Sequence, residues 1–429
     1  MTVRLPDVHS WSAPVVPPLP GRGQQVRLTE SGTGELVATA AEGPATLYVC
    51  GITPYDSTHL GHANTYLGFD LLVRAWADAG RDVRYVQNVT DVDDPLLERA
   101  RQTGVDWQAL AAEQTELFRG DMRALRVLPP EHYVGAVETI PLVVDSVEQL
   151  LASGAAYRVT EPDADGMGVG DVYADTAADA RFAAETGLTA DQKAEFFAER
   201  GGDPDRPGKR QPLDLLLWRT ARPDEPAWDG ASLGDGRPGW HIECATISAE
   251  YLGLPIEVQA GGSDLVFPHH ACSESHLRML SGHERTVTVH AHGGMVAYAG
   301  SKMSKSLGNL VLVSQLTASG VDPMAVRLVM LANHYREDWE YTGAQLRTAT
   351  ERLARWRRAM TAEHGPDATG MLEEVRTALA HDLDAPTAIH AVDAWVAAAE
   401  HDAGTARADA DRGPALAART VDALLGIAV

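Results

Sequence analysis

Three residues with metal-binding side chains stand far apart in the sequence, at positions that an α/β fold would bring together. Cys50 ends a short apolar stretch, Cys244 lies near the start of an expected helix, and His269 starts another. Such positions converge at one edge of a parallel sheet. Two thiolates and one imidazole suit zinc and leave one coordination position open. The alternative is that both cysteines are ordinary buried thiols.

A second candidate site is the segment 58–62, which follows the apolar stretch Leu47–Val49. A helix is expected to begin here, with Ser57 or Thr58 placed to cap it. His59 and His62 would then lie on one face of the first turn. Free backbone N–H groups and the positive end of the helix dipole would form an anion site for a nucleotide phosphate. Two ordinary surface histidines are the alternative.

A third candidate is a loop with two lysines. The chain has 36 basic residues, but its only lysines are Lys193, Lys209, Lys302 and Lys305, and the last two fall within one pentapeptide. Mobile ammonium groups beside a nucleotide can neutralise the charge that builds on a leaving pyrophosphate. The alternative is an ordinary basic loop.

The elements that must position these residues form an α/β pattern in two halves. Residues 46–125 predict strand, helix, strand and helix. Residues 237–318 return to this pattern, with strands expected at 256–260 and 287–292. The two halves therefore predict a nucleotide-binding sheet whose ligand edge carries all three candidate sites.

The remaining regions differ in composition from these halves. Residues 126–236 are interpreted as an insertion, with a helix expected over 133–153. Residues 1–45, rich in proline and glycine, are expected to form a loosely structured arm. Residues 319–429 show amphipathic, alanine-rich periodicity and predict a helical C-terminal domain.

Asp91, Asp93 and Asp94 form an acidic cluster after the second expected strand. They could hold a metal, but aspartate is also favoured at and just before helix starts. We therefore interpret the cluster as helix capping.

Composition excludes several classes of function. The net charge of −24 opposes nonspecific binding of nucleic acid. The sequence shows no apolar run that could span a membrane and no secretion signal. Three sparse cysteines argue against a disulfide framework and favour a reducing compartment. We expect a cytoplasmic protein without a membrane partner, acting as a monomer.

The segment 58–62 resembles the HIGH motif of class I aminoacyl-tRNA synthetases, and 302–306 resembles their KMSKS motif. Four further segments narrow the resemblance to the cysteinyl-tRNA synthetase branch: Cys50-Gly-Ile-Thr53, Gly239-Trp-His-Ile-Glu-Cys244, Gly262-Ser-Asp264 and Phe267-Pro-His-His270. The resemblance implies an α/β fold, namely a class I synthetase Rossmann-like nucleotide-binding domain with an inserted subdomain and a C-terminal helical domain.

Two activities compete within this branch. One is cysteinyl-tRNA synthetase, and the other is a paralogous ligase of mycothiol biosynthesis that joins cysteine to the amine of glucosaminyl-inositol. Glu199-Arg-Gly-Gly-Asp-Pro204 resembles a motif of the ligase, and the C-terminal part is short and not basic. We therefore expect a carbon–nitrogen ligase that uses L-cysteine, ATP and glucosaminyl-inositol, without tRNA. Cysteinyl-tRNA synthetase is the alternative.

The resemblance also implies roles for individual residues. Those implied in catalysis are His59, His62, Lys302 and Lys305. Those implied to hold one zinc ion, with an open position for the substrate thiol, are Cys50, Cys244 and His269. Those implied to line the adenylate site are Cys50, Gly51, Ile52, Thr53, Thr65, Asn88, Val89, Thr90, Trp240, Gly262, Ser263, Asp264 and Val296. Mg²⁺ is expected to accompany ATP.

The chain departs from the synthetase pattern just after His270. The synthetases usually carry Pro-His-His-Glu-Asn-Glu, whose last glutamate lies near zinc, and this chain has Ser273 at that place. Loss of this carboxylate resembles the ligase, whose zinc has three protein ligands. Whether Cys272 or Glu274 approaches the metal is left open.

Overall fold

The computed structural model describes residues 8–55, 58–160, 170–303, 308–401 and 412–429. Its centre is a parallel five-stranded sheet in the order β11-β10-β3-β4-β5. The strands are β3 Ala45–Val49, β4 Val83–Val89, β5 His132–Gly135, β10 Ile256–Gly262 and β11 Val287–Gly293. The strand order reverses beside β3, and ligands of such sheets bind outside the carboxyl ends at this point.

The side chains of β3 point alternately to the two faces of the sheet, and each face has its own apolar core. Leu47 and Val49 belong to one apolar cluster, and Tyr48 and Cys50 belong to another. The first face is covered by α1 Leu60–Asp78 and the second by α6 Trp240–Leu252, on which α4 Ile140–Ser153 and α7 Ala271–Ser281 pack. Side chains of a strand point to opposite faces in turn, so the register of β3 aims Cys50 at α6.

The first half of the fold continues into two further helices. α2 Asp94–Thr103 and α3 Trp107–Ala124 follow β4. Asp93 is the N-cap of α2 and accepts from the Asp94 backbone N–H, while Asp91 accepts from the backbone N–H of Val137. The interpretation of this acidic cluster as helix capping is therefore confirmed for Asp93.

The inserted subdomain is built on an antiparallel sheet in the order β6-β7-β8-β9. Its elements are β6 Ala156–Val159, β7 Asp171–Ala174, α5 Ala190–Glu199, β8 Leu215–Thr220 and β9 Gly236–Pro238. The helix expected over 133–153 begins only at Ile140, and the prediction was wrong for Tyr133 to Gly135. These residues pair with β4 as the edge strand β5, so the central sheet reaches into 126–236.

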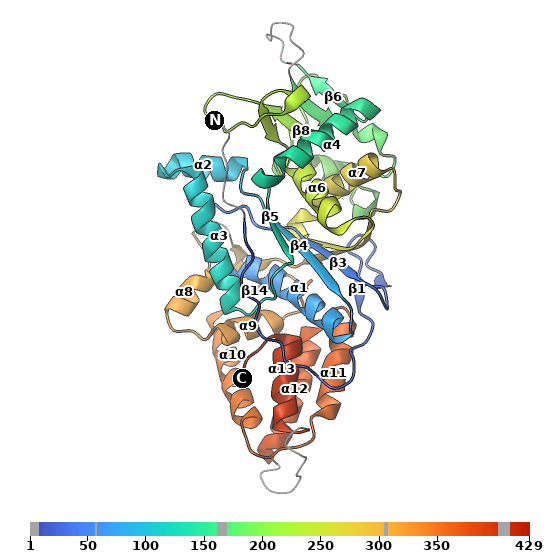
Figure 1. Cartoon of the computed structure of the whole chain (residues 1–429). Helices are drawn as coiled ribbons and strands as arrows, with labels where there is room; N and C mark the ends of the chain where they lie inside the picture. The colour runs from blue at the N-terminus through green and yellow to red at the C-terminus, as the bar shows by residue number, and fades with distance from the viewer. Residues whose placement is uncertain (1–7, 56–57, 161–169, 304–307, 402–411) are drawn as a thin grey trace.

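The C-terminal region is helical, as the periodicity predicted. It contains α9 Pro323–Leu331, α10 Gly343–Met360, α11 Thr369–Ala380, α12 Ala385–His401 and α13 Pro414–Leu425, and the short α8 Val313–Ala318 precedes it. Figure 1 shows these helices at one end of the molecule and the inserted subdomain at the other, with the parallel sheet between them. One continuous apolar core joins the helices to α1 and β3.

Buried charges fasten this helical region to α1. Asp70 pairs with both Arg74 and Arg327, and all three side chains are fully buried. Arg74 donates to the backbone carbonyls of Asp422 and Ala423, and Arg327 donates to that of Leu425. The two guanidinium groups therefore bind carbonyls at the end of α13, where Ala423 and Leu425 lie beyond the last regular helical hydrogen bond.

The arm is more ordered than its composition predicted. β1 Arg27–Thr29 and β2 Leu36–Ala38 form an antiparallel hairpin, and Ser31 in its turn contacts the backbone of His290 on β11. Two short pairings complete the fold, with β12 Val296–Tyr298 between β13 Ser301–Lys302 and β14 Trp339–Glu340. Among the helices in the described ranges, none is both long enough and apolar enough to cross a membrane.

Candidate functional site

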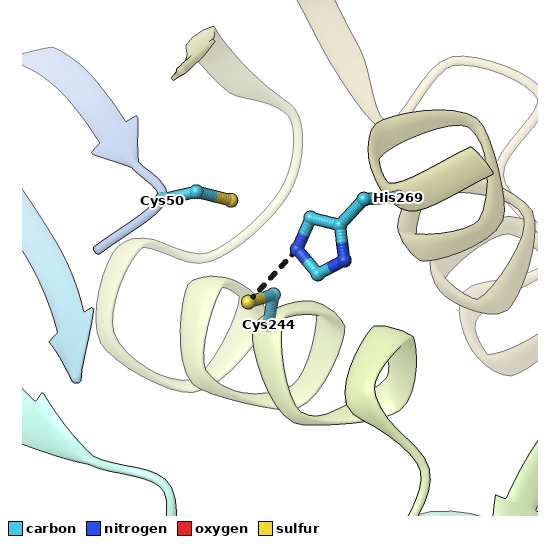
Figure 2. Close-up of side chains that lie close together, drawn as sticks. All are labelled: Cys50, Cys244 and His269. Carbon is cyan, nitrogen blue, oxygen red and sulfur yellow. Dashed lines mark hydrogen bonds between the residues drawn. The ribbon is translucent and has the colours of Figure 1, made fainter. Parts of the chain in front are cut away.

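The structure brings the three predicted metal ligands together in the interior (Figure 2). Cys50 follows the last residue of β3, Cys244 lies in the second turn of α6, and His269 lies in the helical turn Val266–His270 that leads into α7. All three are buried, and their ligand atoms lie within 4.8 Å of one another. Nε2 of His269 is 3.2 Å from Sγ of Cys244. The arrangement fits a soft metal ion with one position open.

The electrostatics of the two thiols differ although they are neighbours. Burial raises the pKa of the Cys50 thiol well above its usual value. Burial also acts to raise the pKa of Cys244, but a hydrogen bond with Cys50 and the nearby His269 outweigh it, so that this pKa lies well below its usual value. Of the two thiols, Cys244 therefore loses its proton more readily, and metal binding requires the deprotonated form of a cysteine ligand.

Histidine side chains surround this group and fix its orientation. Nδ1 of His269 lies 3.0 Å from Nδ1 of His241, and its ring stacks on Trp240 with centroids 4.1 Å apart. Burial lowers the pKa of His241 well below its usual value, so this imidazole is neutral. Contacts of this kind to the remote nitrogen of a ligand histidine hold its ring in place.

A chain of hydrogen bonds runs from Cys50 to the hairpin of the arm. Nε2 of His270 lies 3.1 Å from Sγ of Cys50, and its Nδ1 lies 2.7 Å from Nε2 of His292. Nδ1 of His292 lies 2.7 Å from Oγ of Ser31, which donates to the carbonyl of His290. Because the Ser31 hydroxyl donates its only proton to that carbonyl, its oxygen must accept from His292. His292 therefore carries a proton on Nδ1.

A cavity of about 420 Å³ opens beside the metal-binding group at the carboxyl end of β3. The predicted site residues that line it are Cys50, Gly51, Ile52, Thr53, His59, His62, Thr65, Trp240, Gly262, Asp264 and Val296. It joins the cysteine and histidine cluster to the start of α1, so one ligand could contact both.

The start of α1 is held by His59 itself. His59 is the N-cap, and its Nδ1 accepts from the backbone N–H of Gly61 at 3.1 Å. The cap expected at Thr58 was wrong, and Ser57 lies outside the described residues. The His59 and His62 rings stack with centroids 3.9 Å apart, and both line the cavity. The first turn has no acidic residue, so its positive dipole end faces the cavity without a local counter-charge from the helix.

Comparison with known proteins identifies the family. Residues 36–351 match the family described as tRNA synthetases class I (C) catalytic domain. An L-cysteine:1D-myo-inositol 2-amino-2-deoxy-alpha-D-glucopyranoside ligase from Beutenbergia cavernae is 61% identical over 423 residues, which cover 98% of this chain and 100% of the relative. The ligase of the same name from Kineococcus radiotolerans is 59% identical over 98% of this chain and 99% of the relative. The chain belongs to the class I synthetase family and, within it, to these ligases.

Solved structures at low identity share the fold of this ligase family member. A Mycobacterium tuberculosis methionyl-tRNA synthetase bound by methionyl-adenylate aligns with a TM-score of 0.63 at 17% identity, covering 89% of this chain and 92% of that one. A LeuRS from Agrobacterium radiobacter K84 in a ternary complex aligns with a TM-score of 0.60 at 12% identity, covering 89% and 83%. The fold expected from the resemblance is therefore confirmed.

Four predicted adenylate residues of this ligase family member do not line the cavity: Asn88, Val89, Thr90 and Ser263. Asn88 is buried, and its Oδ1 accepts from the Gly51 backbone N–H at 2.8 Å and from the Tyr48 hydroxyl at 3.1 Å. Its Nδ2 donates to Oγ1 of Thr90. The Asn88 amide therefore braces the ends of β3 and β4 behind the cavity wall.

The two predicted catalytic lysines cannot be placed. Lys302 lies in β13, but its side chain and all of Lys305 are outside the described part of the chain. Met303, between them, is buried and lines the cavity, so this loop begins at the site.

Sequence reasoning missed several residues of the cavity wall: Tyr55, Tyr66, Leu265, Gly294, Met295, Met303 and Leu310. Gly294 and Met295 directly follow β11, so the rule that ligands bind at carboxyl strand ends could have found them. Tyr66 lies on the inner face of α1 with no polar pattern to mark it.

Neither Cys272 nor Glu274, the two residues whose approach to the metal the sequence left open, belongs to the metal-binding group found in the described ranges. Glu274 pairs with Arg278 at 3.0 Å and with His290 at 3.3 Å. Ser273, which replaces the glutamate of the synthetases, donates to the backbone carbonyls of His241 and His269. The position that differs from the synthetases therefore braces the ligand turn.

Proposed function

We propose that the protein is an ATP-dependent ligase of mycothiol biosynthesis. It activates L-cysteine as cysteinyl-AMP and forms an amide with the amine of glucosaminyl-inositol. The observation that carries the proposal is the cavity that places a buried Cys–Cys–His group beside the start of α1. Identity of 54–61% to ligases of this name, over nearly their whole length, supports the acceptor.

Cys50, Cys244 and His269 are the residues that would hold zinc in this site. Their donor set and burial fit the ion, and the lowered pKa of Cys244 favours the deprotonated form that a metal ligand needs. Bound zinc would take the substrate thiolate in its open position and so favour cysteine over serine, whose hydroxyl is a poorer ligand.

In the first step, the cysteine carboxylate attacks the α-phosphate of ATP, and pyrophosphate leaves. His59 and His62, with the N–H groups at the start of α1, would bind the phosphates. Lys302 and Lys305 would approach the leaving group, where negative charge accumulates in the transition state. Mg²⁺ would accompany ATP as it does in phosphoryl-transfer sites.

In the second step, the neutral amine of the sugar attacks the activated carbonyl, a carbon–nitrogen bond forms, and AMP leaves. The cavity walls formed by Trp240 and Asp264 would keep the adenylate from water until the acceptor arrives.

The acceptor assay tests the proposal. Purified protein is incubated with ATP and labelled cysteine, once with glucosaminyl-inositol and once with tRNA. We expect labelled amide with the amino sugar and no charged tRNA. Charging of tRNA without reaction at the sugar would overturn the proposal in favour of a cysteinyl-tRNA synthetase, and absence of cysteine-dependent pyrophosphate exchange would exclude both.

A further inference from the structure

The segment Glu199-Arg-Gly-Gly-Asp-Pro204 stands out in the sequence, yet it has no place in the proposed reaction. It follows the end of α5 in the inserted subdomain. The structure describes all of its residues, and none of them lines the cavity beside the metal-binding group. Its role therefore does not come from direct contact with a ligand in that cavity.

The Arg200 side chain reaches from this segment to the turn between β10 and α7. Its Nη1 donates to the backbone carbonyl of Asp264 at 2.6 Å and also to the carbonyl of Phe267. The guanidinium lies over the ring of Phe196, 4.6 Å from its centroid. One cation thus joins two carbonyls of a turn more than sixty residues away in the sequence.

The turn that Arg200 holds carries parts of both halves of the site. It runs from the short helix Ser263–Leu265 into the turn Val266–His270, and Phe267 within it has extended backbone angles. Carbonyls at such a break lack a regular helical partner, and a buried carbonyl without a donor is costly. Asp264 at the start lines the cavity, and His269 at the end belongs to the metal-binding group.

The other residues of the segment fix the base from which Arg200 extends. Gly201 has a φ of +88°, which side chains other than glycine rarely adopt. A Cβ on Gly202 would lie 2.4 Å from the Phe197 ring. Asp203 accepts from the Tyr173 hydroxyl and pairs with Nζ of Lys209 at 2.9 Å. The segment is therefore built to hold one orientation.

We propose that Arg200 is a positioning residue that holds the 263–268 turn, and through it His269 and Asp264, in the geometry that the metal and the adenylate require. The inference rests on the proposed function, because it assumes a metal at the cysteine and histidine cluster. On this inference, the segment 199–204 supports the site of the first step and does not contact the sugar.

Arg200→Met and Arg200→Lys test the inference, with Arg222→Met as the matched control. Methionine keeps the aliphatic length over Phe196 but has no donor. Arg222 lies in the same subdomain and pairs with Asp171, away from the turn. We measure zinc release to a chelator, the absorption spectrum of the Co²⁺-substituted protein, and the KM for cysteine in pyrophosphate exchange.

We expect Arg200→Met to release zinc about 10-fold faster and to raise the KM for cysteine about 10-fold. The reason is that loss of a side chain that supports a metal ligand from outside typically weakens metal binding by about this factor. Its Co²⁺ spectrum should shift. Arg200→Lys should recover part of each effect, and Arg222→Met should match the wild type throughout.

The outcomes separate this inference from the proposed function. A wild-type protein without bound zinc would contradict the proposed metal site itself. A wild type that retains zinc, together with an Arg200→Met variant of unchanged zinc release and unchanged KM, would overturn the role of Arg200 alone. Where circular dichroism shows that Arg200→Met does not fold, Arg200→Lys decides: an unchanged Co²⁺ spectrum and zinc release overturn the inference.

Discussion

Nε2 of His269 lies 3.2 Å from Sγ of Cys244, although one residue leads into α7 and the other lies in α6. The contact exists because both elements pack on the face of the sheet to which β3 directs Cys50. The register of one strand therefore determines where the ligand set forms.

The first prediction concerns metal binding. Cys244→Ser should lose most of the bound zinc and the ability to select cysteine, because a serine hydroxyl is a far weaker ligand than a thiolate. Elemental analysis and cysteine-dependent pyrophosphate exchange measure both effects. Cys272→Ser is the control, since Cys272 is also buried but lies outside the ligand group. Equal zinc loss in both variants would mean that the metal is not bound at this group.

The second prediction separates the two roles of His59. His59→Asn should keep the helix cap, because asparagine is a favoured N-cap residue, while it removes the imidazole. We expect the rate of adenylate formation to fall about 100-fold, as when one transition-state donor is removed. His59→Ala should show the same loss of rate and a further stability loss of about 1 kcal/mol. Normal exchange kinetics in His59→Asn would contradict the assigned role.

The third prediction concerns pH and stability. His290 lies between Glu30 and Glu274, at 3.4 and 3.3 Å. Burial acts to lower the pKa of His290, but the two carboxylates outweigh it and raise this pKa to about 9. A pKa raised on folding stabilises the protein fully below the unfolded value near 6.5, and this stabilisation is lost as pH rises through 9.

The expected loss of unfolding free energy between these pH values is about 3 kcal/mol. Urea unfolding at pH 6, 8 and 9.5 measures it. His290→Gln should be less stable at pH 6 and should lose most of this pH dependence. His132→Gln, at a more exposed histidine, should follow the wild-type profile. A wild type equally stable at pH 6 and 9.5 would show that His290 is not charged in the folded state.

The fourth prediction concerns the close approach of β3 and β4. A Cβ on Gly51 would lie 1.6 Å from the Asn88 carbonyl oxygen, so Gly51→Ala must displace the strand end. We expect a loss of about 3 kcal/mol or more, at the upper end for overpacking, with loss of activity. Gly120→Ala in α3 meets open space and should gain about 0.5–1 kcal/mol. Denaturant unfolding distinguishes the two, and a neutral Gly51→Ala would contradict the packing.

The sequence predicted the convergence of Cys50, Cys244 and His269, because strand ends and helix starts of an α/β unit meet at one edge. It did not predict that His59 caps its own helix, since histidine is not a usual capping residue. Tyr133–Gly135 was misread because a short apolar run before a helix has no distinguishing periodicity. The Asn88 amide turns inward because it accepts from the backbone N–H of Gly51, which follows β3, and no local sequence pattern predicts a contact between such distant residues.

The attachment of α13 to α1 makes the last helix of the chain part of the core of the nucleotide-binding half. Arg74 and Arg327 are buried with Asp70 as their shared counter-charge, and carbonyls at the end of α13 are among their remaining partners. A chain that ended before Pro414 would take these carbonyls from both guanidinium groups and expose the apolar side of α1 that α13 covers. A variant that ends before Pro414 should therefore unfold at a lower urea concentration than the full chain, because the final helix completes the core around α1.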